Sequence, residues 1–360
     1  MNDLAAGRYP IREFARLTGV NPATLRAWER RYGIIQPHRS PKGHRFYSER
    51  QVDTVRQILY WLEKGYPIRQ VKVLLQQPVS DQAPSEGMAY AHSDEWLQHQ
   101  ESLYNAILAF NQTGMEDLLN NGFATYPVAV YYQFCLVPVL EKLRSGSEPE
   151  LVLTVFEHWL NRKLDAILQH QQRHNQGDPL VILASHEDAR TECLIRACAL
   201  GAAGIRVDCF SRDISPNDLA LLADAIQANG LWLHFHASNQ VATPLWQHYL
   251  ATPSQRPGIR HFLSGHVPAP RTSRSDSHPT EQLAQPEEHA SVHELNRLEQ
   301  PLQQQLQQVI SIIRTEHSLE GVSGTTDIHE AHVSKTHVSK THVSEASAAE
   351  ANHSENGDVL

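Results

Sequence analysis

The sequence has no apolar run long enough to cross a bilayer. Its longest apolar stretches, such as residues 180–184 and 151–156, fall far short of the roughly 20 residues that a spanning helix needs. Met1 is not followed by a charged and then apolar leader, so we expect a cytoplasmic protein that contacts no membrane. The four cysteines show neither metal-ligand spacing nor the pattern of a secreted disulfide framework, which favours buried, reduced thiols.

Motifs for catalysis are also absent. The chain has no nucleophile elbow, phosphate-binding loop, paired catalytic carboxylates or metal-spaced cluster of ligands. We therefore expect a protein that is not an enzyme, with no catalytic residues and no metal site.

Positive charge is concentrated at one end of the chain. Residues 1–77 carry 14 Lys and Arg against 6 Asp and Glu, a net charge of +8, whereas the remaining residues sum to -17. A basic segment joined to an acidic remainder is typical of a nucleic-acid-binding module attached to a part that does not contact phosphate.

Periodicity and composition predict a multi-domain α and α/β protein. Apolar residues recur at helical spacing in one segment, and short apolar runs alternate with helical patterns in the next. The predicted parts are a winged helix-turn-helix at 1–77, a linker at 78–93, a four-helix bundle at 94–175, a flavodoxin-like (Rossmann-like) parallel sheet domain at 176–267, and a mostly disordered tail at 268–360.

The tail is rich in Pro, Ser, His, Gln and Glu and contains the repeat AHVSK, THVSK, THVSE. Its evenly spaced histidines, His332, His337 and His342, are interpreted as exposed polar residues of an unstructured repeat. Residues 291–316 are the exception, because apolar residues repeat at helical spacing after Pro301 and predict a helix.

The first 33 residues predict a helix-turn-helix. Residues 11–18 have the pattern of a short helix, and Gly19 and Val20 then turn the chain. Asn21 is a good N-cap and Pro22 suits the first helical position, so a second helix is expected over 22–32, ending at Gly33. The second helix of such a motif enters the major groove, so the exposed side chains expected to reach DNA are Thr24, Arg26 and Arg30, with Leu25 and Trp28 packing inward.

Residues 37–47 predict a β-hairpin wing around a turn at Gly43. In this segment, PHRSPKGHRFY, Arg39, Lys42 and Arg45 are expected to contact phosphates. His44 and Tyr47 are expected to hydrogen-bond the backbone oxygens of the DNA beside them.

These residues resemble the DNA-binding domain of the MerR family, through the segment TLRxWExRYG and the PxR, GxR and Tyr positions of the wing. The resemblance implies a dimeric or larger regulator that binds a near-palindromic operator in double-stranded DNA, with RNA polymerase as its partner at the promoter. It implies a DNA-binding site made of Thr24, Arg26, Trp28, Arg30, Arg31, Tyr32, Arg39, Lys42, Gly43, His44, Arg45 and Tyr47.

The order of the remaining parts, over residues 94–266, is similar to that of the curli-activator MlrA type and of the CarH type, whose α/β half has a cobalamin-binding fold. That fold uses Glu-x-His-x-x-Gly after its first strand, and the matching positions here are Glu187, Ala189 and Glu192. A methyl group cannot ligate cobalt, and Glu adds bulk and charge where Gly allows close approach. The Glu-His pair above the cobalt corresponds to Glu157 and His158, but the Trp expected some ten residues earlier is absent.

We therefore expect a degenerate pocket with no cofactor, although cobalamin binding with its own base below the cobalt stays open. His186 is interpreted as a strand-end histidine that faces solvent or caps the next helix. The expected function is a DNA-binding transcriptional regulator whose α/β half serves as an oligomerisation or partner scaffold. The alternative is a regulator that responds to cobalamin or to another ligand in the crevice at the strand ends.

Overall fold

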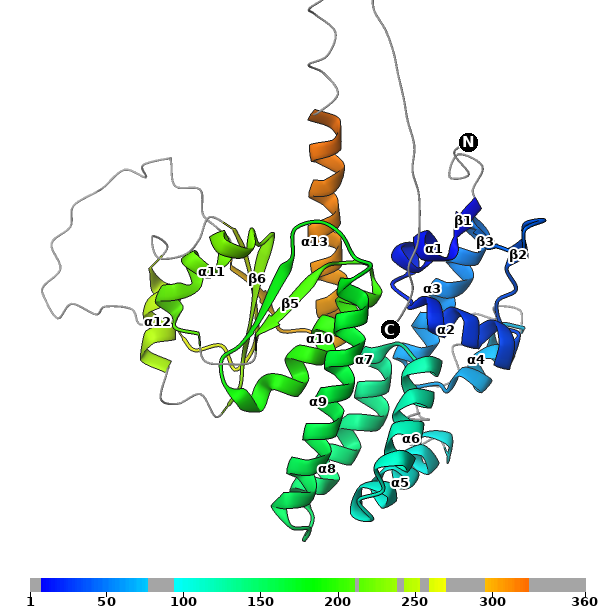
Figure 1. Ribbon diagram of the computed structural model, residues 1–360, viewed down its shortest axis with the longest axis horizontal. Helices are drawn as coiled ribbons and strands as arrows, with labels where there is room; N and C mark the ends of the chain where they lie inside the picture. The colour runs from blue at the N-terminus through cyan, green and yellow to red at the C-terminus, as the bar shows by residue number, and fades with distance from the viewer. Residues whose placement is uncertain are drawn as a thin grey trace, which may run out of the picture. The chain divides into compact units, whose positions relative to one another are not determined.

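The computed structural model describes residues 8–76, 94–210, 214–237, 243–252, 259–269 and 295–323 (Figure 1). Within these ranges, no helix combines the length and apolar character needed to cross a membrane. Cys135, Cys193 and Cys198 are free and buried, as expected, and burial raises the pKa of the Cys193 thiol to about 12.

The N-terminal region, residues 8–76, combines four α-helices and a π-helical turn with a small antiparallel sheet of order β1-β3-β2. Its elements are β1 (Arg8–Pro10), α1 (Ile11–Thr18), α2 (Pro22–Ala27), the π-helical turn η2 (Trp28–Tyr32), β2 (His38–Arg39), β3 (Arg45–Ser48), α3 (Glu49–Glu63) and α4 (Ile68–Leu74). The helix at 11–18 and the hairpin wing are as predicted, whereas the pairing of β1 with β3 was not.

Local chemistry explains where these elements start and stop. Gly19 ends α1 with φ 72°, a left-handed conformation that glycine adopts without steric cost. The Asn21 side chain accepts from the Ala23 backbone N–H, which caps α2. At α3, the Ser48 backbone N–H donates to the Gln51 side chain at 2.9 Å, forming one half of a capping box.

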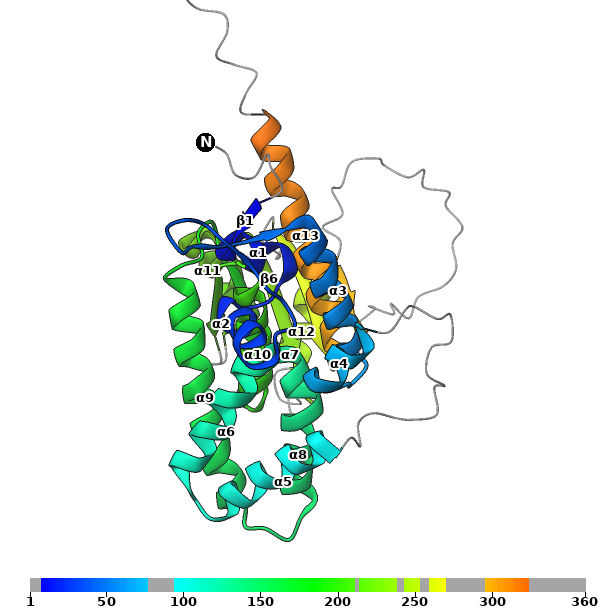
Figure 2. The same cartoon turned by 90° about the vertical axis from the view of Figure 1, so that its right-hand side faces the viewer.

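The helical region, residues 94–172, consists of helices that run side by side (Figure 2). They are α5 (Asp94–Leu108), α6 (Gln112–Thr125), α7 (Val128–Tyr131), the π-helical turn η4 (Tyr132–Leu136), α8 (Val137–Ser145) and α9 (Glu150–Gln172). On α9, Phe156, Leu160 and Leu164 are fully buried at helical spacing. A Cβ at Gly122 of α6 would lie 2.2 Å from Cζ of Tyr131, so this glycine permits a close approach.

The α/β region, between residues 180 and 323, is built on a parallel sheet of order β5-β4-β6-β7-β8. Its elements are β4 (Leu180–Ala184), η5 (Glu187–Ala189), α10 (Arg190–Ala202), β5 (Val207–Phe210), η6 (Pro216–Asp218), α11 (Leu219–Ile226), β6 (Gly230–Phe235), α12 (Thr243–Ala251), β7 (Arg260–Gly265), β8 (Leu295–Leu298) and α13 (Leu302–Ser323). The strand order reverses between β4 and β6, so the crevice at their carboxyl ends is the place where open α/β sheets bind ligands.

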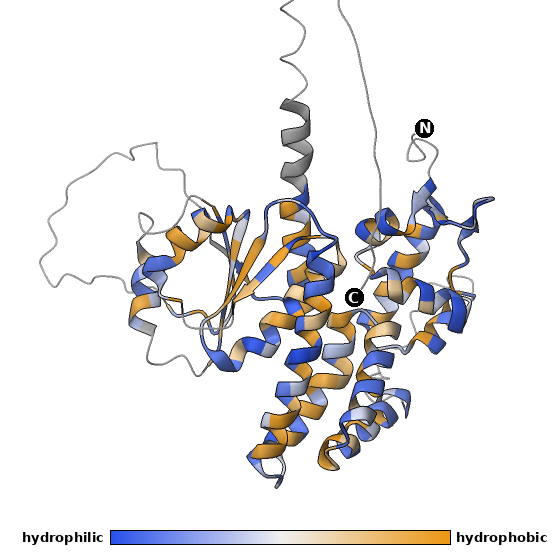
Figure 3. Ribbon diagram, in the orientation of Figure 1, coloured by the Kyte–Doolittle hydropathy of each residue, from blue (hydrophilic) through white to orange (hydrophobic). Residues whose placement is uncertain are grey.

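Alternate strand residues serve the two faces of the sheet. Val181 and Leu183 pack in one cluster with apolar residues of α11 and α12, whereas Leu180 and Ile182 belong to the cluster that includes residues of α10 and α13. Helices therefore cover both faces, and the strands between them are strongly apolar (Figures 1 and 3). Continuous burial of this kind is typical of parallel sheets.

The prediction of a helix over 291–316 is corrected at its start. Residues Leu295–Leu298 form β8, which pairs in parallel with β7, and the helix begins at Leu302 after Pro301. Leu306, Val309 and Ile313 of α13 are buried in the core, so this segment completes the α/β region and is not part of a disordered tail. Residues 295–298 form a strand because the edge of β7 offers backbone N–H and C=O groups as hydrogen-bond partners, which the spacing of apolar residues in the sequence does not reveal. The histidine repeat lies outside the described residues.

Candidate nucleic acid interface and strand end crevice

The predicted recognition helix, α2 with η2, presents two different faces. Leu25 and Trp28 are fully buried, as expected from their positions in the motif. Arg26 and Arg30 are exposed on the remaining surface, which keeps two cations of this helix available to a DNA duplex. Gly33 ends the helix with φ 59°.

Thr24 corrects the expectation that it is exposed. It is 1% exposed, and its hydroxyl donates to the Phe123 backbone oxygen of α6 at 3.4 Å. Trp28 Nε1 donates to the backbone oxygen of Thr125 at 2.7 Å, and Arg31 donates to the Asn121 side chain. This face of the recognition helix therefore packs on α6 of the helical region.

Tyr32 is half-buried beside the same contact. It lines a cavity of about 250 Å³ together with Arg69 of α4 and Glu95 of α5. The predicted site residues Thr24, Trp28, Arg31 and Tyr32 thus lie toward α5 and α6, whereas the exposed Arg26 lines a separate cavity with Lys163 and His170 of α9.

The wing is attached to the recognition helix through Glu29. Its carboxylate accepts from Arg45 Nε at 2.5 Å and from Arg39 Nη2 at 2.7 Å. Burial alone would raise the pKa of Glu29, but the hydrogen bonds and charges of these two arginines outweigh it and lower that pKa. Lys42 and His44 are exposed at the tip, where Gly43 turns the chain with φ 79°.

Tyr47 is also a correction, because it is not available at the surface of the wing. Its ring is fully buried and stacks on Phe14 with the centroids 4.1 Å apart. Burial raises the pKa of its phenol to about 12, and the hydroxyl has no hydrogen-bond partner among the described residues. Tyr47 packs the wing strand onto α1 and cannot reach a phosphate in this arrangement.

The three positions of the degenerate motif, Glu187, Ala189 and Glu192, lie in the α/β region, on the segment that follows β4. Glu187 is exposed on η5, and Ala189 is fully buried at the start of α10. Glu192 follows on α10 and points into a polar cluster at the ends of β6 and β7. A buried methyl at 189 and a carboxylate at 192 do not provide the cobalt ligand and the glycine of a cobalamin site.

A chain of hydrogen bonds occupies the space at Glu192. Trp232 Nε1 donates to Ser264 Oγ at 2.7 Å, and Ser264 Oγ lies 2.8 Å from His234 Nδ1. His234 Nε2 lies 2.5 Å from Glu192 Oε2. All contacts are satisfied when Ser264 donates to Nδ1 of a neutral imidazole and Nε2–H donates to the carboxylate.

Electrostatics agree with this protonation pattern. Burial, with the positive charge of Arg196, lowers the pKa of His234 to about 4, although the Glu192 hydrogen bond opposes it. For Glu192 burial acts to raise the pKa, but the hydrogen bond from His234 and the nearby cationic groups lower it to about 2. Near neutral pH, the pair is therefore a neutral His234 and an ionised Glu192.

His234 and Arg196 were missed in the sequence. The signal for His234 was present, because a histidine interrupts the apolar strand LWLHF and a buried polar group needs partners. His234, Arg196 and Glu192 line a cavity of about 560 Å³ at the carboxyl ends of the strands.

The proposed upper pair, Glu157 and His158, lies elsewhere on α9. Glu157 Oε1 accepts from Arg144 Nη2 of α8 at 3.0 Å, and His158 is exposed. Neither residue is among those that line the crevice cavity. Of these five predicted pocket residues, only Glu192 lines the crevice cavity, while Glu187 and Ala189 lie just before it on η5.

Residues 9–78 match the family model described as MerR HTH family regulatory protein. The N-terminal region is therefore a MerR helix-turn-helix domain, and the chain is homologous to MerR-family transcriptional regulators over most of its length. It is 28% identical over 209 residues to the HTH-type transcriptional regulator MlrA of Salmonella typhimurium, which covers 58% of this chain and 81% of that protein.

Two further relatives show how far the similarity extends. The chain is 27% identical over 248 residues to the HTH-type transcriptional repressor CarH of Myxococcus xanthus, covering 65% of this chain and 81% of that protein. The mercuric resistance operon regulatory protein of Bacillus cereus is 35% identical over 81 residues, which is 22% of this chain and 61% of that protein. Similarity to MlrA and CarH thus continues beyond the DNA-binding domain.

Proposed function

We propose that this chain is a sequence-specific, DNA-binding transcriptional regulator that acts without enzymatic activity. The carrying observation is the exposed set of cations on the recognition helix and wing, from Arg26 and Arg30 to Arg39 and Lys42. These side chains have the length and charge to reach phosphates and base edges of a duplex. The names of the relatives, regulator and repressor, support the same role.

In this proposal α2 enters the major groove through its free face, and the wing contacts the adjacent backbone. Glu29 fixes the position of the wing relative to the recognition helix, because its carboxylate, on that helix, binds Arg39 and Arg45 of the wing. Arg45 is therefore chiefly a positioning residue for the wing, whereas the exposed Arg26, at the rim of the cavity beside α9, is proposed to contact DNA directly.

The helical and α/β regions are proposed to act as a scaffold for oligomerisation or for a partner protein. Support comes from the contact between α2 and α6, which joins the DNA-reading helix to the rest of the chain through Trp28 and Thr24. A homo-oligomer presents two such helices to the half-sites of a near-palindromic operator, where RNA polymerase is the expected partner. Light scattering of the purified chain tests this, and a monomer at all concentrations would contradict it.

A second candidate is regulation by a ligand in the crevice at the strand ends. The cavity of about 560 Å³ favours it, and the sheet order corresponds to the flavodoxin-like arrangement, in which ligands bind at this reversal of strand order. We propose that cobalamin itself is not this ligand, because Ala189 is buried and Glu192 is engaged by His234. Separately, we propose that the helices of residues 94–172 pack as a four-helix bundle.

The test of DNA binding uses operator fragments found by genome-wide mapping of bound DNA, with affinity measured by fluorescence anisotropy. Arg26→Ala and Arg45→Ala are each expected to weaken binding by about 1 to 3 kcal/mol, or roughly fivefold to 150-fold. The matched control is Arg206→Ala, which removes an exposed arginine of the α/β region. If both variants bind the operator as the parent does at physiological salt, the proposed docking is wrong.

A further inference from the structure

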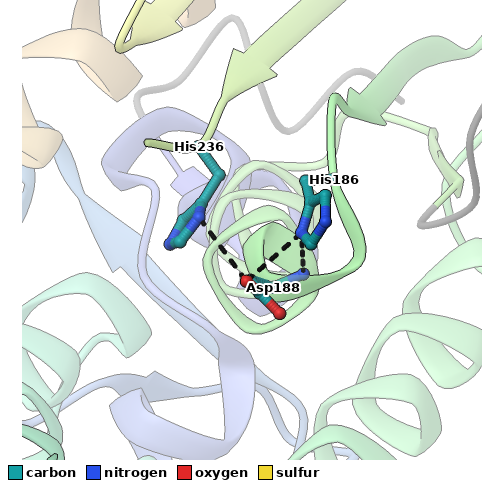
Figure 4. Close-up of side chains that lie close together, drawn as sticks. All are labelled: His186, Asp188 and His236. Carbon is teal, nitrogen blue, oxygen red and sulfur yellow. Dashed lines mark hydrogen bonds and ion pairs between the residues drawn. The ribbon is translucent and has the colours of Figure 1, made fainter. Parts of the chain in front are cut away.

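Two histidines and an aspartate from two loops, one after β4 and one after β6, meet at the carboxyl ends of the strands (Figure 4). His186 follows β4, Asp188 lies on η5, and His236 follows β6. We propose that these three residues form a binding site for a divalent transition-metal ion of the Zn²⁺ class. The site goes beyond the proposed function and does not depend on DNA binding.

The spacing of the ligand atoms suits such an ion. Asp188 Oδ2 lies 3.2 Å from His186 Nδ1 and 3.9 Å from His236 Nδ1. The ligating atoms of all three residues lie within 4.8 Å of one another. Metal–ligand bonds of about 2.0 to 2.1 Å at tetrahedral angles place neighbouring ligand atoms about 3.3 Å apart, so only small side-chain movements complete the site.

The backbone around the cluster is fixed by its own hydrogen bonds. Buried Ser185 accepts from the His236 backbone N–H at 3.0 Å, and its own N–H donates to the backbone oxygen of His234 at 2.9 Å. These bonds tie the loop after β4 to the loop after β6. The two histidines are thereby held side by side before any ion binds, with ring centroids 6.3 Å apart.

The chemistry of the donor set is also appropriate. Neutral imidazole and carboxylate are common ligands of Zn²⁺, and a site with three protein ligands leaves a fourth position for water or another donor. The side chains of His186, Asp188 and His236 are 34%, 50% and 29% exposed, so an ion has a path from solvent. The ionised carboxylate of Glu192 nearby adds negative charge that favours a dication.

His186 at present caps η5, with Nδ1 accepting from the Asp188 backbone N–H at 3.3 Å. This agrees with the sequence interpretation of a helix-capping histidine, but it is a long hydrogen bond and is readily exchanged for a metal bond. The expectation of no metal site arose because His236 lies 50 residues from His186 in the sequence and reaches it only through the pairing of β4 with β6.

The experiment measures Co²⁺ and Zn²⁺ binding to the full chain. Because any accessible imidazole is a competing ligand for Co²⁺ and Zn²⁺, the parent for all comparisons carries His332→Ala, His337→Ala and His342→Ala. Co²⁺ is expected to bind with one ion per chain and to give the visible absorption bands of a low-symmetry site, which Zn²⁺ then removes by displacement. Zn²⁺ is also expected to raise the thermal midpoint of this parent.

The variants His186→Gln, Asp188→Asn and His236→Gln are each expected to weaken Co²⁺ binding more than about tenfold and to abolish the Zn²⁺ effect on the thermal midpoint. The matched control His158→Gln, which replaces an exposed histidine of α9, should leave both unchanged. Melting curves without metal verify that each variant folds. The proposal is overturned if the parent binds no Co²⁺, or if variants that fold bind it as tightly as the parent.

Discussion

His234 should make the α/β region sensitive to mild acid. The residue is 3% exposed, and its pKa is about 4 in the folded chain against an ordinary value of 6.5. Because the unfolded chain takes up a proton at a higher pH than the folded chain, the stabilisation is fully present above pH 6.5 and is lost as the pH falls from 6.5 toward 4. From pH 7.5 to pH 5, the loss from this one group is about 2 kcal/mol.

The assay is urea unfolding followed by tryptophan fluorescence at pH 7.5 and pH 5. We expect His234→Gln to be less stable than the parent at pH 7.5, because it breaks the bonds to Ser264 and Glu192. Its free energy of unfolding should, however, fall by about 2 kcal/mol less between the two pH values. The control His158→Gln removes an exposed histidine and should keep the full pH dependence.

Glu192 acts in a different pH window. Its pKa of about 2 lies below the ordinary 4.5, so its stabilisation is present above pH 4.5 and is lost as the pH falls from there toward 2. Glu192 therefore contributes little between pH 7.5 and pH 5, and the difference in pH dependence between the parent and His234→Gln reports on His234. If His234→Gln shows the same pH dependence as the parent, the assignment of a buried neutral imidazole is refuted.

Three further outcomes follow from the same structure. Gly122→Ala should lower the free energy of unfolding by about 1 to 3 kcal/mol, because the new methyl meets the Tyr131 ring; an unchanged thermal midpoint would contradict that close approach. Glu29→Gln should steepen the salt dependence of DNA binding, because Arg39 and Arg45 lose a neutralising carboxylate; an unchanged slope in anisotropy titrations would argue against it. Adenosylcobalamin should form no stable red complex, and illumination should not alter operator binding; a red complex with light-dependent affinity would reverse this conclusion.

Elements with dense local signals were predicted closely from the sequence. The helix expected over 11–18 matches α1 residue for residue, and the apolar run at 180–184 is the strand β4. Each has a strong periodicity bounded by turn residues, so local sequence is sufficient. The cationic positions of the DNA-binding motif were predicted in the same way, since Arg26 and Arg30 follow from helical geometry.

Contacts between distant parts of the chain were not predictable by these means. Thr24 was expected to be exposed because nothing near it in sequence reveals that its partner is Phe123. β8 required knowledge of the edge of β7, and the meeting of His186 with His236 required the pairing of β4 and β6. A single sequence gives the periodicity of each element but not which element lies beside it.

The segment 295–323 offers the strictest test of where the α/β region ends. Leu298, Leu306, Val309 and Ile313 are each at most 4% exposed, and burial of side chains of this size stabilises a fold by about 1.5 to 3 kcal/mol each. Arg314 also donates to the backbone oxygen of Ala203 at 2.7 Å, which anchors α13 at the end of α10.

A chain truncated after Gly265 loses all of these contacts and exposes the edge of β7. The lost burial amounts to several kcal/mol. This is comparable with the whole free energy of unfolding of a typical domain, which is about 5 to 15 kcal/mol. We therefore expect this truncation to lower the thermal midpoint strongly and to cause aggregation. Truncation after Ser323 is the matched control, because it keeps α13 and should leave the midpoint unchanged. If both truncated chains have the same thermal midpoint and the same oligomer size, β8 and α13 contribute nothing to the fold, and the reasoning from their burial is refuted.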